Sequence, residues 1–511
     1  MSESSGNTKR IMKNTVMLYI RMAVIMLVTL YTSRVVLDVL GVEDYGIYNI
    51  VGSVVISLSF IQSALNSATL RFISFELGKS DKGNVSRIFS MSLNIQVLFL
   101  CVILLMLETV GLWFLNNVLS IPPDRIFAAN VAYQFSILTF CINVLRVPYN
   151  AMLISYEKMS VYAILSIVEA ILRLLIVYCL LVLDHDKLIE YSILMFAVAL
   201  LTNAFYMIYC RKLFTDSCKY KFEKDKSLFK SMIGFSGWNL VGGLTGMATH
   251  EGPNYFMNIY LGVRVNAAMG VAKQVGSAVY NFTENFQTAF RPQIVKYYAA
   301  DEKENLFELV FNASKISFFL MFIIGFPVLL CINGILNVWL VEVPEYTAEF
   351  CVCMLLGYMV NALSSPLWML AHATGDIKKY QISLSIIQLT IVPIAWIILA
   401  IGLEPYYILA FQVLINCAVY AYRLYFARLK TGFPIIAYLK SVVVKSVILT
   451  LLIIPVPVLL QVLFNSGFSW MLSAISSVVI SVIVFFYFGL EKEYRNQLLL
   501  YVKQKIKRND I

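Results

Sequence analysis

The stretch RIMKNTVMLYIRMAVIMLVTLYTSRVVLDVLGVEDYGIYNIVGSVV at residues 10–55 decides how the rest of the chain is interpreted. It joins two apolar runs through a turn that contains Leu-Gly-Val at 40–42 and the acidic pair Glu43 and Asp44. The same Leu-Gly-Val triplet returns at 261–263, at an offset of 221 residues. Three further pairs keep offsets of 218 to 220 residues, namely Arg71 with Arg291, Pro148 with Pro366, and Ser166 with Ser385. We therefore predict two homologous halves.

The composition is typical of a membrane protein. Of the 511 residues, 60% are hydrophobic and 14% are charged, and the mean hydropathy is +0.77, whereas soluble domains carry about 25% charged residues. The net charge of +10 comes from Lys and Arg in short loops and tails, where they set topology, so we expect no nucleic-acid partner. The nine cysteines lie mostly in apolar runs, so we interpret them as small apolar residues and expect no metal site.

Apolar runs of about 20 residues predict an all-α polytopic membrane protein with about 14 transmembrane helices. The predicted centres lie near Met26, Leu58, Val97, Leu138, Ile171, Val198, Gly243, Gly276, Phe319, Leu356, Gln388, Gln412, Leu451 and Val479. Helices 1–6 and 7–12 form two six-helix repeats, and two C-terminal helices follow them. The expected domains are a lobe at 1–214, a basic linker at 215–229, a second lobe at 230–432, helices 13 and 14 at 433–490, and a basic tail at 491–511.

Basic residues gather in one set of the predicted loops and tails. This set includes Lys9 and Arg10, the segment 211–230, the group Arg423, Arg428 and Lys430, and the C-terminal tail. The opposite loops carry mainly acidic residues. Because Lys and Arg are retained on the cytoplasmic side, both termini are predicted to be cytoplasmic.

Two segments resemble a known family. Residues 254–300 contain YFMNIYLGVRVNAAMGVAKQVGSAVYNFTENFQTAFRPQIVKYYA, and residues 32–48 run from Thr-Ser-Arg-Val-Val-Leu to Asp-Tyr-Gly-Ile-Tyr. Both resemble the matching regions of bacterial polysaccharide-export flippases in the multidrug/oligosaccharidyl-lipid/polysaccharide superfamily. Met269 departs from the basic residue expected there in many relatives.

The resemblance implies an activity. Such proteins carry undecaprenyl-diphosphate-linked sugars from the inner to the outer leaflet of the bacterial inner membrane. We therefore expect a flippase for an O-antigen, capsule or related surface polysaccharide unit that works by alternating access. Its expected partners are the lipid-linked oligosaccharide, membrane lipids, a glycan polymerase and a chain-length regulator, with no bound cofactor.

Charges within the apolar runs are candidate binding residues, because a charge in mid-membrane costs about 2.5–3.5 kcal/mol unless it has a partner or a wet cavity. Arg21 lies about 10 Å inside the cytoplasmic end of helix 1, and Lys273 lies about as deep from the outer end of helix 8. One interpretation is a cavity in which both bind a lipid diphosphate. The alternative is an ion pair between Arg21 and Glu284, and the sequence leaves both open.

Two further groups are candidates for coupling or gating. Glu169 and Arg173 are four residues apart in helix 5, which favours a structural ion pair over a role in proton or cation coupling. In helix 7, Gly252-Pro253 is expected to break or kink the helix and to act as a hinge. His250 and Glu251 lie beside this point and either titrate during transport or satisfy the broken backbone.

Two other functions were weighed. A cation-coupled multidrug exporter of the same fold usually has about twelve helices and needs a different cavity. A membrane glycosyltransferase or polymerase would use Glu43 and Asp44 as an acid pair, but it generally needs a large outer loop, and the predicted outer loops are short. We therefore expect a transporter that is not an enzyme.

Overall fold

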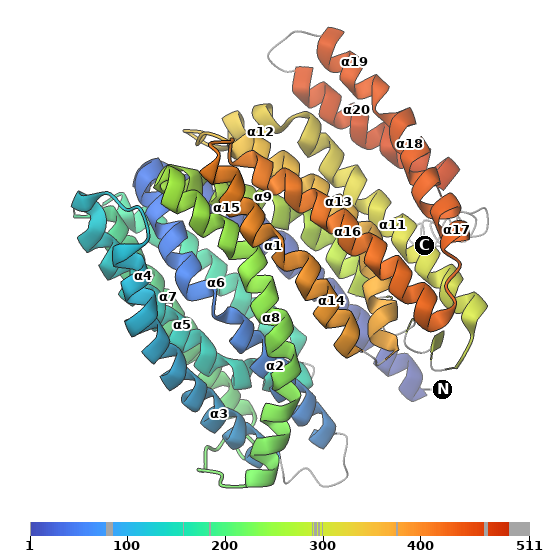
Figure 1. Ribbon diagram of the computed structural model, residues 1–511. Helices are drawn as coiled ribbons and strands as arrows, with labels where there is room; N and C mark the ends of the chain where they lie inside the picture. The colour runs from blue at the N-terminus through green and yellow to red at the C-terminus, as the bar shows by residue number, and fades with distance from the viewer. Residues whose placement is uncertain are drawn as a thin grey trace, which may run out of the picture. The chain divides into compact units, whose positions relative to one another are not determined.

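The computed structural model describes residues 2–77, 85–156, 158–182, 185–288, 290, 294, 297–298, 300–374, 377–463 and 469–489. Within these residues every regular element is a helix (Figure 1). Eleven of the described helices are long and apolar enough to span a membrane. The predicted all-α polytopic membrane fold is therefore confirmed. The count of fourteen spans remains a prediction.

The first half of the chain contains seven named α-helices. They are α1 (Ser2–Ile56), α2 (Ser59–Leu77), α3 (Val85–Met106), α4 (Leu112–Asn117), α5 (Ile126–Ser155), α6 (Met159–Leu180) and α7 (Lys187–Leu213). A π-helical stretch at Leu107–Gly111 joins α3 to α4, so that Val85–Asn117 forms one membrane-length span.

The second half begins with α8 (Lys226–Leu261) and α9 (Val263–Thr288). It continues with α11 (Lys303–Leu330), α12 (Ile332–Trp339), α13 (Thr347–Ala373), α14 (Ile377–Leu389), α15 (Ile391–Ala400) and α16 (Tyr406–Thr431). The last helices are α17 (Ile435–Tyr438), α18 (Lys445–Ile453), α19 (Pro455–Leu463) and α20 (Ser469–Val484). All the predicted helix centres lie inside helices except Leu58, which lies in the turn between α1 and α2.

The described residues divide into two compact units. Unit 1 comprises the residues up to Val271, with Leu340–Glu345 and Ala395–Gly402. Unit 2 comprises Ala272–Trp339, Tyr346–Ile394 and the residues from Leu403 onward. These units are groups of residues in contact and do not follow the predicted repeats. The predicted lobes at 1–214 and 230–432, joined by a linker at 215–229, therefore stay a prediction.

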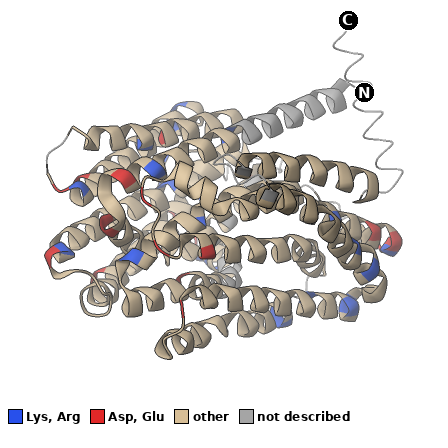
Figure 2. Ribbon diagram, turned by 90° about the horizontal axis from the view of Figure 1, so that it is seen from above, with Lys and Arg blue, Asp and Glu red and all other residues tan. Residues whose placement is uncertain are grey.

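Each unit has its own helix packing. In unit 1, α1 packs on α6, α5 packs on α7, and α2 packs on both α5 and α8. In unit 2, α13 packs between α11 and α16, and α20 packs on α11. Charged residues are sparse along the helices, and most of them lie near helix ends and connections (Figure 2). This distribution is expected for helices that pass through hydrocarbon.

The two Leu-Gly-Val turns have the same backbone conformation. Gly41 has φ 75° and ψ 170°, and Gly262 has φ 78° and ψ −169°. This combination is accessible almost exclusively to glycine, because a Cβ would collide with the backbone. The residue at which α1 changes direction therefore matches the residue at which α8 ends and α9 begins. The shared conformation is what the repeat would require, and the repeat itself stays a prediction.

The segment at 219–223, in the basic linker, is fixed along the first turns of α3. The Ser86 hydroxyl donates to the backbone oxygen of Lys219 at 3.2 Å. The Ser90 hydroxyl accepts from the backbone N–H of Lys221 at 3.1 Å. Because Ser86 and Ser90 are four residues apart, they lie on one face of α3. This face therefore binds the main chain of the linker.

The same face continues to Asn94, whose amide donates to the backbone oxygen of Glu223 at 2.9 Å. Next to it, Arg87 pairs with Glu223 and Asp225, each at 3.1 Å. The Arg87 guanidinium lowers the pKa of Glu223, and the backbone N–H groups of Leu228 and Ser227 lower the pKa of Asp225. Because both carboxyl pKa values are lowered, the contact is fully stabilised at a pH above the ordinary carboxyl pKa of about 4. The stabilisation is lost as the pH falls through the lowered pKa values of Glu223 and Asp225.

The paired glycines lead to a stability prediction. Gly41→Ala and Gly262→Ala should each destabilise the protein by about 1–3 kcal/mol, because alanine is strained at this φ and ψ. Gly52→Ala is the matched control, since a Cβ built on Gly52 meets no atom within 4 Å. Thermal melting of the purified variants in detergent measures the difference. Equal melting temperatures for all three variants would show that the shared turn is not needed.

Candidate functional site

Arg21 contacts the aromatic ring of Tyr162 on α6. Its guanidinium carbon lies 4.6 Å from the ring centroid, and its Nη2 donates to the Tyr162 hydroxyl at 3.4 Å. Its Nε is buried without a hydrogen-bond partner among the described residues. A cation held over a ring keeps its charge and most of its five N–H donors. Arg21 is therefore held in place within unit 1 and retains capacity to bind an anion.

Lys273 and Glu284 both belong to α9. They are eleven residues apart, which is close to three helical turns, so they lie on one face about 16 Å apart along the axis. On the same face, Tyr280 stacks on Tyr358 of α13, with ring centroids 4.6 Å apart. Both α9 residues belong to unit 2, whereas Arg21 belongs to unit 1. The alternative pairing of Arg21 with Glu284 therefore remains a prediction.

The ion pair predicted between Glu169 and Arg173 is present and has a third member. Arg173 Nη2 lies 2.6 Å from one carboxylate oxygen of Glu169, and Arg146 Nη1 lies 2.8 Å from the other. The Glu169 carboxylate thus joins α5 to α6 and leaves a net charge of about +1 on the cluster. Arg146 also lies over Tyr206 of α7, at 5.3 Å from the ring centroid. The sequence did not reveal this partner, because Arg146 and Glu169 are not at helical spacing.

In the second half of the chain, a half-buried arginine has a hydroxyl and not a carboxylate as its partner. Ser364 corresponds to Arg146 at an offset of 218 residues, and its hydroxyl accepts from Arg423 Nη1 at 2.5 Å. Arg423 was grouped with loop charges, but it lies within α16, is half-buried, and precedes the last residue of that helix by eight positions. The prediction that Arg423 lies in a loop is therefore wrong. The arginine lies on α5 in the first half, as Arg146, and on α16 in the second half, as Arg423.

The predicted break at Gly252-Pro253 is not present. Helix α8 runs without interruption from Lys226 to Leu261, with Pro253 inside it. Proline removes one backbone donor, but membrane helices tolerate this loss where neighbouring groups compensate. His250 is exposed and Glu251 is half-buried. Hinge bending at this point remains a prediction, whereas a broken helix is wrong.

A network of buried asparagines surrounds the turn between α8 and α9. Asn266 Nδ2 donates to Asn254 Oδ1 at 2.8 Å, and Asn258 Nδ2 donates to Asn266 Oδ1 at 2.7 Å. Asn254 Nδ2 also donates to the Ser53 hydroxyl of α1 at 3.1 Å. The backbone N–H of Ser120 donates to Asn258 Oδ1 at 2.9 Å. These bonds connect α8 and α9 to α1 and to the turn after α4.

The backbones come close together at the same place. A Cβ on Gly46 would lie 2.1 Å from the backbone oxygen of Val263, and a Cβ on Gly270 would lie 2.6 Å from Asn49 Oδ1. The Tyr255 hydroxyl donates to the backbone oxygen of Ser53 at 2.9 Å. Glycine is required for this approach, because any side chain would push the helices apart. The sequence signal was three asparagines within one apolar hairpin, which the sequence analysis did not use.

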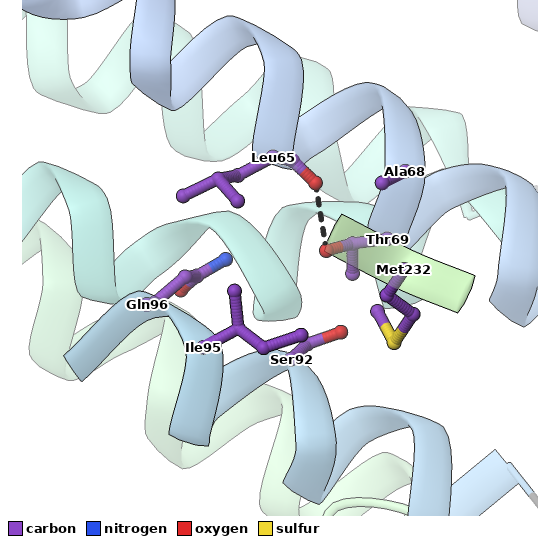
Figure 3. Close-up of a pocket in the computed structure, with 7 residues that line it drawn as sticks. All are labelled: Leu65, Ala68, Thr69, Ser92, Ile95, Gln96 and Met232. Carbon is purple, nitrogen blue, oxygen red and sulfur yellow. Dashed lines mark hydrogen bonds between the residues drawn. The ribbon is translucent and has the colours of Figure 1, made fainter. Parts of the chain in front are cut away.

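A small cavity with both apolar and polar lining residues lies between α2, α3 and α8 (Figure 3). Its volume is about 10 Å³, which suits a single water molecule. Gln96 and Ser92 line it from α3, and Gln96 is 1% exposed. Both amide atoms of Gln96 and the Ser92 hydroxyl have no hydrogen-bond partner among the described residues. Because Gln96 needs both a donor and an acceptor there, a water molecule fits the site better than a cation.

Comparison with known proteins gives the fold family. No protein-family model matches the chain. The uncharacterised membrane protein EpsK of Bacillus subtilis (strain 168) is 20% identical over 286 residues, which is 55% of this chain and 56% of that protein. The match therefore spans little more than half the length of this relative.

Solved structures match over much more of the chain. A structure of the lipid II flippase MurJ in an inward closed conformation has a TM-score of 0.68 at 13% identity, covering 93% of this chain and 98% of MurJ. An inward-facing multidrug resistance MATE family transporter of the MOP superfamily has a TM-score of 0.66 at 15% identity, covering 81% of this chain and 98% of that protein. An outward-facing one has a TM-score of 0.61 at 16% identity, covering 82% and 96%. The chain therefore has the same fold as these solved transporters.

The ion cluster on α5 and α6 leads to a second prediction. Glu169→Gln leaves Arg146 and Arg173 without their counter-ion, and breaking a buried pair in this way costs about 3–5 kcal/mol. Arg173→Gln should cost clearly less, because the pair of Arg146 with Glu169 survives. Thermal melting of the two purified variants measures the order. An equal or larger loss for Arg173→Gln would contradict the three-residue arrangement.

Proposed function

We propose that this protein is a transporter that moves an undecaprenyl-diphosphate-linked oligosaccharide from the inner to the outer leaflet by alternating access. The observation that supports this most is the match in length to a lipid II flippase. That likeness covers 93% of this chain, whereas the two multidrug transporters cover 81% and 82%. The difference is in keeping with α17–α20, which lie beyond the two repeats.

Arg21 and Lys273 are the proposed contacts of the diphosphate. The Arg21 guanidinium is held by Tyr162 and has a buried Nε that the described residues leave unbonded. A planar guanidinium donates two parallel hydrogen bonds to phosphate oxygens, and Lys adds a mobile point charge. On the proposed topology, Arg21 lies nearer the inner leaflet, where the head group enters, and Lys273 nearer the outer leaflet, where it leaves.

The asparagine network is the proposed closure on the outer side. With both termini in the cytoplasm, the turn at Gly262 lies on the outer side of the membrane. The hydrogen bonds of Asn254, Asn258 and Asn266 and the close approach at Gly46 hold α1, α8 and α9 together there. Release of the substrate to the outer leaflet then requires these bonds to exchange for bonds to water or substrate. Hydrogen bonds suit this role, because they exchange at little net cost.

Coupling and gating are assigned to a further group of residues. Glu169 and Arg173 are the proposed coupling pair, and His250, Glu251, Gly252, Pro253 and Glu284 are the proposed gating residues. A proton or cation that neutralised Glu169 would release Arg146 and Arg173 from it and would thereby loosen α5 from α6. The proposed location is the bacterial inner membrane, with a glycan polymerase and a chain-length regulator as partners.

The alternative is a cation-coupled multidrug exporter, which the likeness to the MATE transporters favours. The two functions differ in the charge of the substrate. Cationic contacts such as Arg21 and Lys273 suit a diphosphate and would repel a cationic drug. Drug sensitivity and surface-glycan export measured in the same deletion strain distinguish them.

The proposed role of Arg21 leads to a third prediction. Arg21→Ala should abolish glycan export, and Arg21→Lys should restore part of it, because the forked donor is lost but the charge remains. Export of surface glycan by a strain that lacks the native gene and carries each variant measures the effect. Arg428→Ala is the control, since Arg428 is an exposed arginine in the last turn of α16. It should export normally.

The double variant separates binding from pairing. If Arg21 only pairs with Glu284, then Arg21→Gln combined with Glu284→Gln removes both charges and restores export, because no charge is left unpaired. If Arg21 binds the diphosphate, the double variant stays inactive. Export at the wild-type level by a stably inserted double variant would contradict substrate binding by Arg21.

A further inference from the structure

A groove lies between α3 and the linker that leads into α8. Its volume is about 420 Å³, and it is lined by residues 91–101 of α3 and by 222–229. None of these residues belongs to the proposed substrate path, and all of them belong to unit 1. The groove is therefore a separate feature, and its chemistry can be derived from its walls.

The wall on α3 belongs to the lipid-facing surface of that helix. Val97 and Leu98 are 49% and 50% exposed, and Cys101 is exposed beside them. The exposed apolar face continues along α3 through Val102 and Leu105. In a membrane-spanning helix, such a face is covered by hydrocarbon. The groove thus opens on the side from which lipid chains approach.

The opposite wall is aromatic and is held in place. Phe222 is 69% exposed, and Phe229 lies in the first turn of α8. The main chain next to Phe222 is fixed to α3 by the Asn94 bond to Glu223 and by the Arg87 pairs. An exposed aromatic side chain of this size is more stable in contact with the acyl chains of lipids than in contact with water. The linker therefore presents an apolar wall in a fixed position.

The rim of the groove carries positive charge that can meet a phosphate. Lys224 and Lys226 are exposed at the groove, between and beside two carboxylates. Those carboxylates, Glu223 and Asp225, both form ion pairs with Arg87. Lys224, Lys226 and Arg87 carry three positive charges against these two negative ones, so the net charge is +1.

The length of the span places this rim at the lipid head groups. The span Val85–Asn117 has 33 residues, which is about 50 Å of helix, whereas the hydrocarbon core is about 30 Å thick. When the excess of about 20 Å is shared equally between the two ends, the first turns of α3 extend beyond the hydrocarbon, which then begins within about one turn of Asn94. Anionic head groups and basic side chains meet at this level.

We propose that this groove binds an anionic phospholipid, with its phosphate at Lys224 and Lys226 and an acyl chain along Val97, Leu98 and Cys101. On the proposed topology, the lipid comes from the cytoplasmic leaflet. A bound lipid stabilises the contact of the linker with α3. Lipid composition therefore changes how firmly the segment between the two predicted halves is held. This assignment does not depend on which molecule the protein transports.

Native mass spectrometry of the purified full-length protein tests the head-group site. Phosphatidylglycerol should bind more tightly than phosphatidylcholine. The double variant Lys224→Ala with Lys226→Ala should weaken phosphatidylglycerol binding by about tenfold or more, because each basic residue near an anionic surface contributes about fivefold. The matched control is Lys212→Ala with Lys379→Ala, two exposed lysines outside the groove, and it should bind as the wild type does. Equal weakening by both double variants would contradict the site.

Fluorescence quenching locates the acyl chain. In a protein whose six native tryptophans are replaced by phenylalanine, a tryptophan placed by Leu98→Trp should be quenched more by brominated phosphatidylglycerol than by brominated phosphatidylcholine in vesicles of otherwise equal composition. The preference should disappear when Lys224 and Lys226 are alanine. A tryptophan at Leu175, an exposed position on α6, should show no preference. Equal quenching of Leu98→Trp by both lipids would contradict the proposal, as would a protein partner that excludes lipid from the groove.

Discussion

The structure depends on one constraint, which is that a charge or polar group inside a membrane helix needs a partner, because hydrocarbon supplies none. Glu169 meets this need for two arginines at once. Arg423 meets it through Ser364, and three asparagines meet it through one another. Arg21 meets it through the ring and hydroxyl of Tyr162, and its Nε has no hydrogen-bond partner among the described residues, as is also true of Arg146 and Arg423. Arg21 is the proposed anion contact because, unlike Arg146, it pairs with no carboxylate among the described residues.

The same constraint applies to the two predicted halves, whose glycine turns share a backbone conformation and whose charges differ. The turns at Gly41 and Gly262 share a conformation that only glycine adopts readily. The charges that stabilise each half do not follow the repeat, since Arg146 corresponds to Ser364. Gln96 on α3 likewise corresponds to Lys315 on α11 at an offset of 219 residues, and both are buried. On the proposed function, a shared backbone with different charges would let the two predicted halves contact different parts of one substrate.

Local patterns in the sequence predicted much of the fold. Apolar runs located the helices, the Leu-Gly-Val triplets located two glycine turns of the same conformation, and the spacing of Glu169 and Arg173 predicted their pair. Contacts distant in sequence could not be predicted in this way. Arg146 reaches Glu169 from another helix, and Ser86, Ser90 and Asn94 bind a linker more than 120 residues away. Pro253 shows the limit of local rules, because α8 continues through a residue that usually interrupts a helix.

The account depends on movement of a lipid-linked oligosaccharide across the membrane, and the leaflet that holds this lipid is measurable. The lipid-linked oligosaccharide of cells with and without the native gene can be treated with an oxidant that does not cross the inner membrane. The account predicts that the lipid is accessible from outside when the protein is present. Without the protein, it should accumulate in the inaccessible leaflet. Equal accessibility in both strains, with the oligosaccharide lipid present in equal amount, would contradict the account.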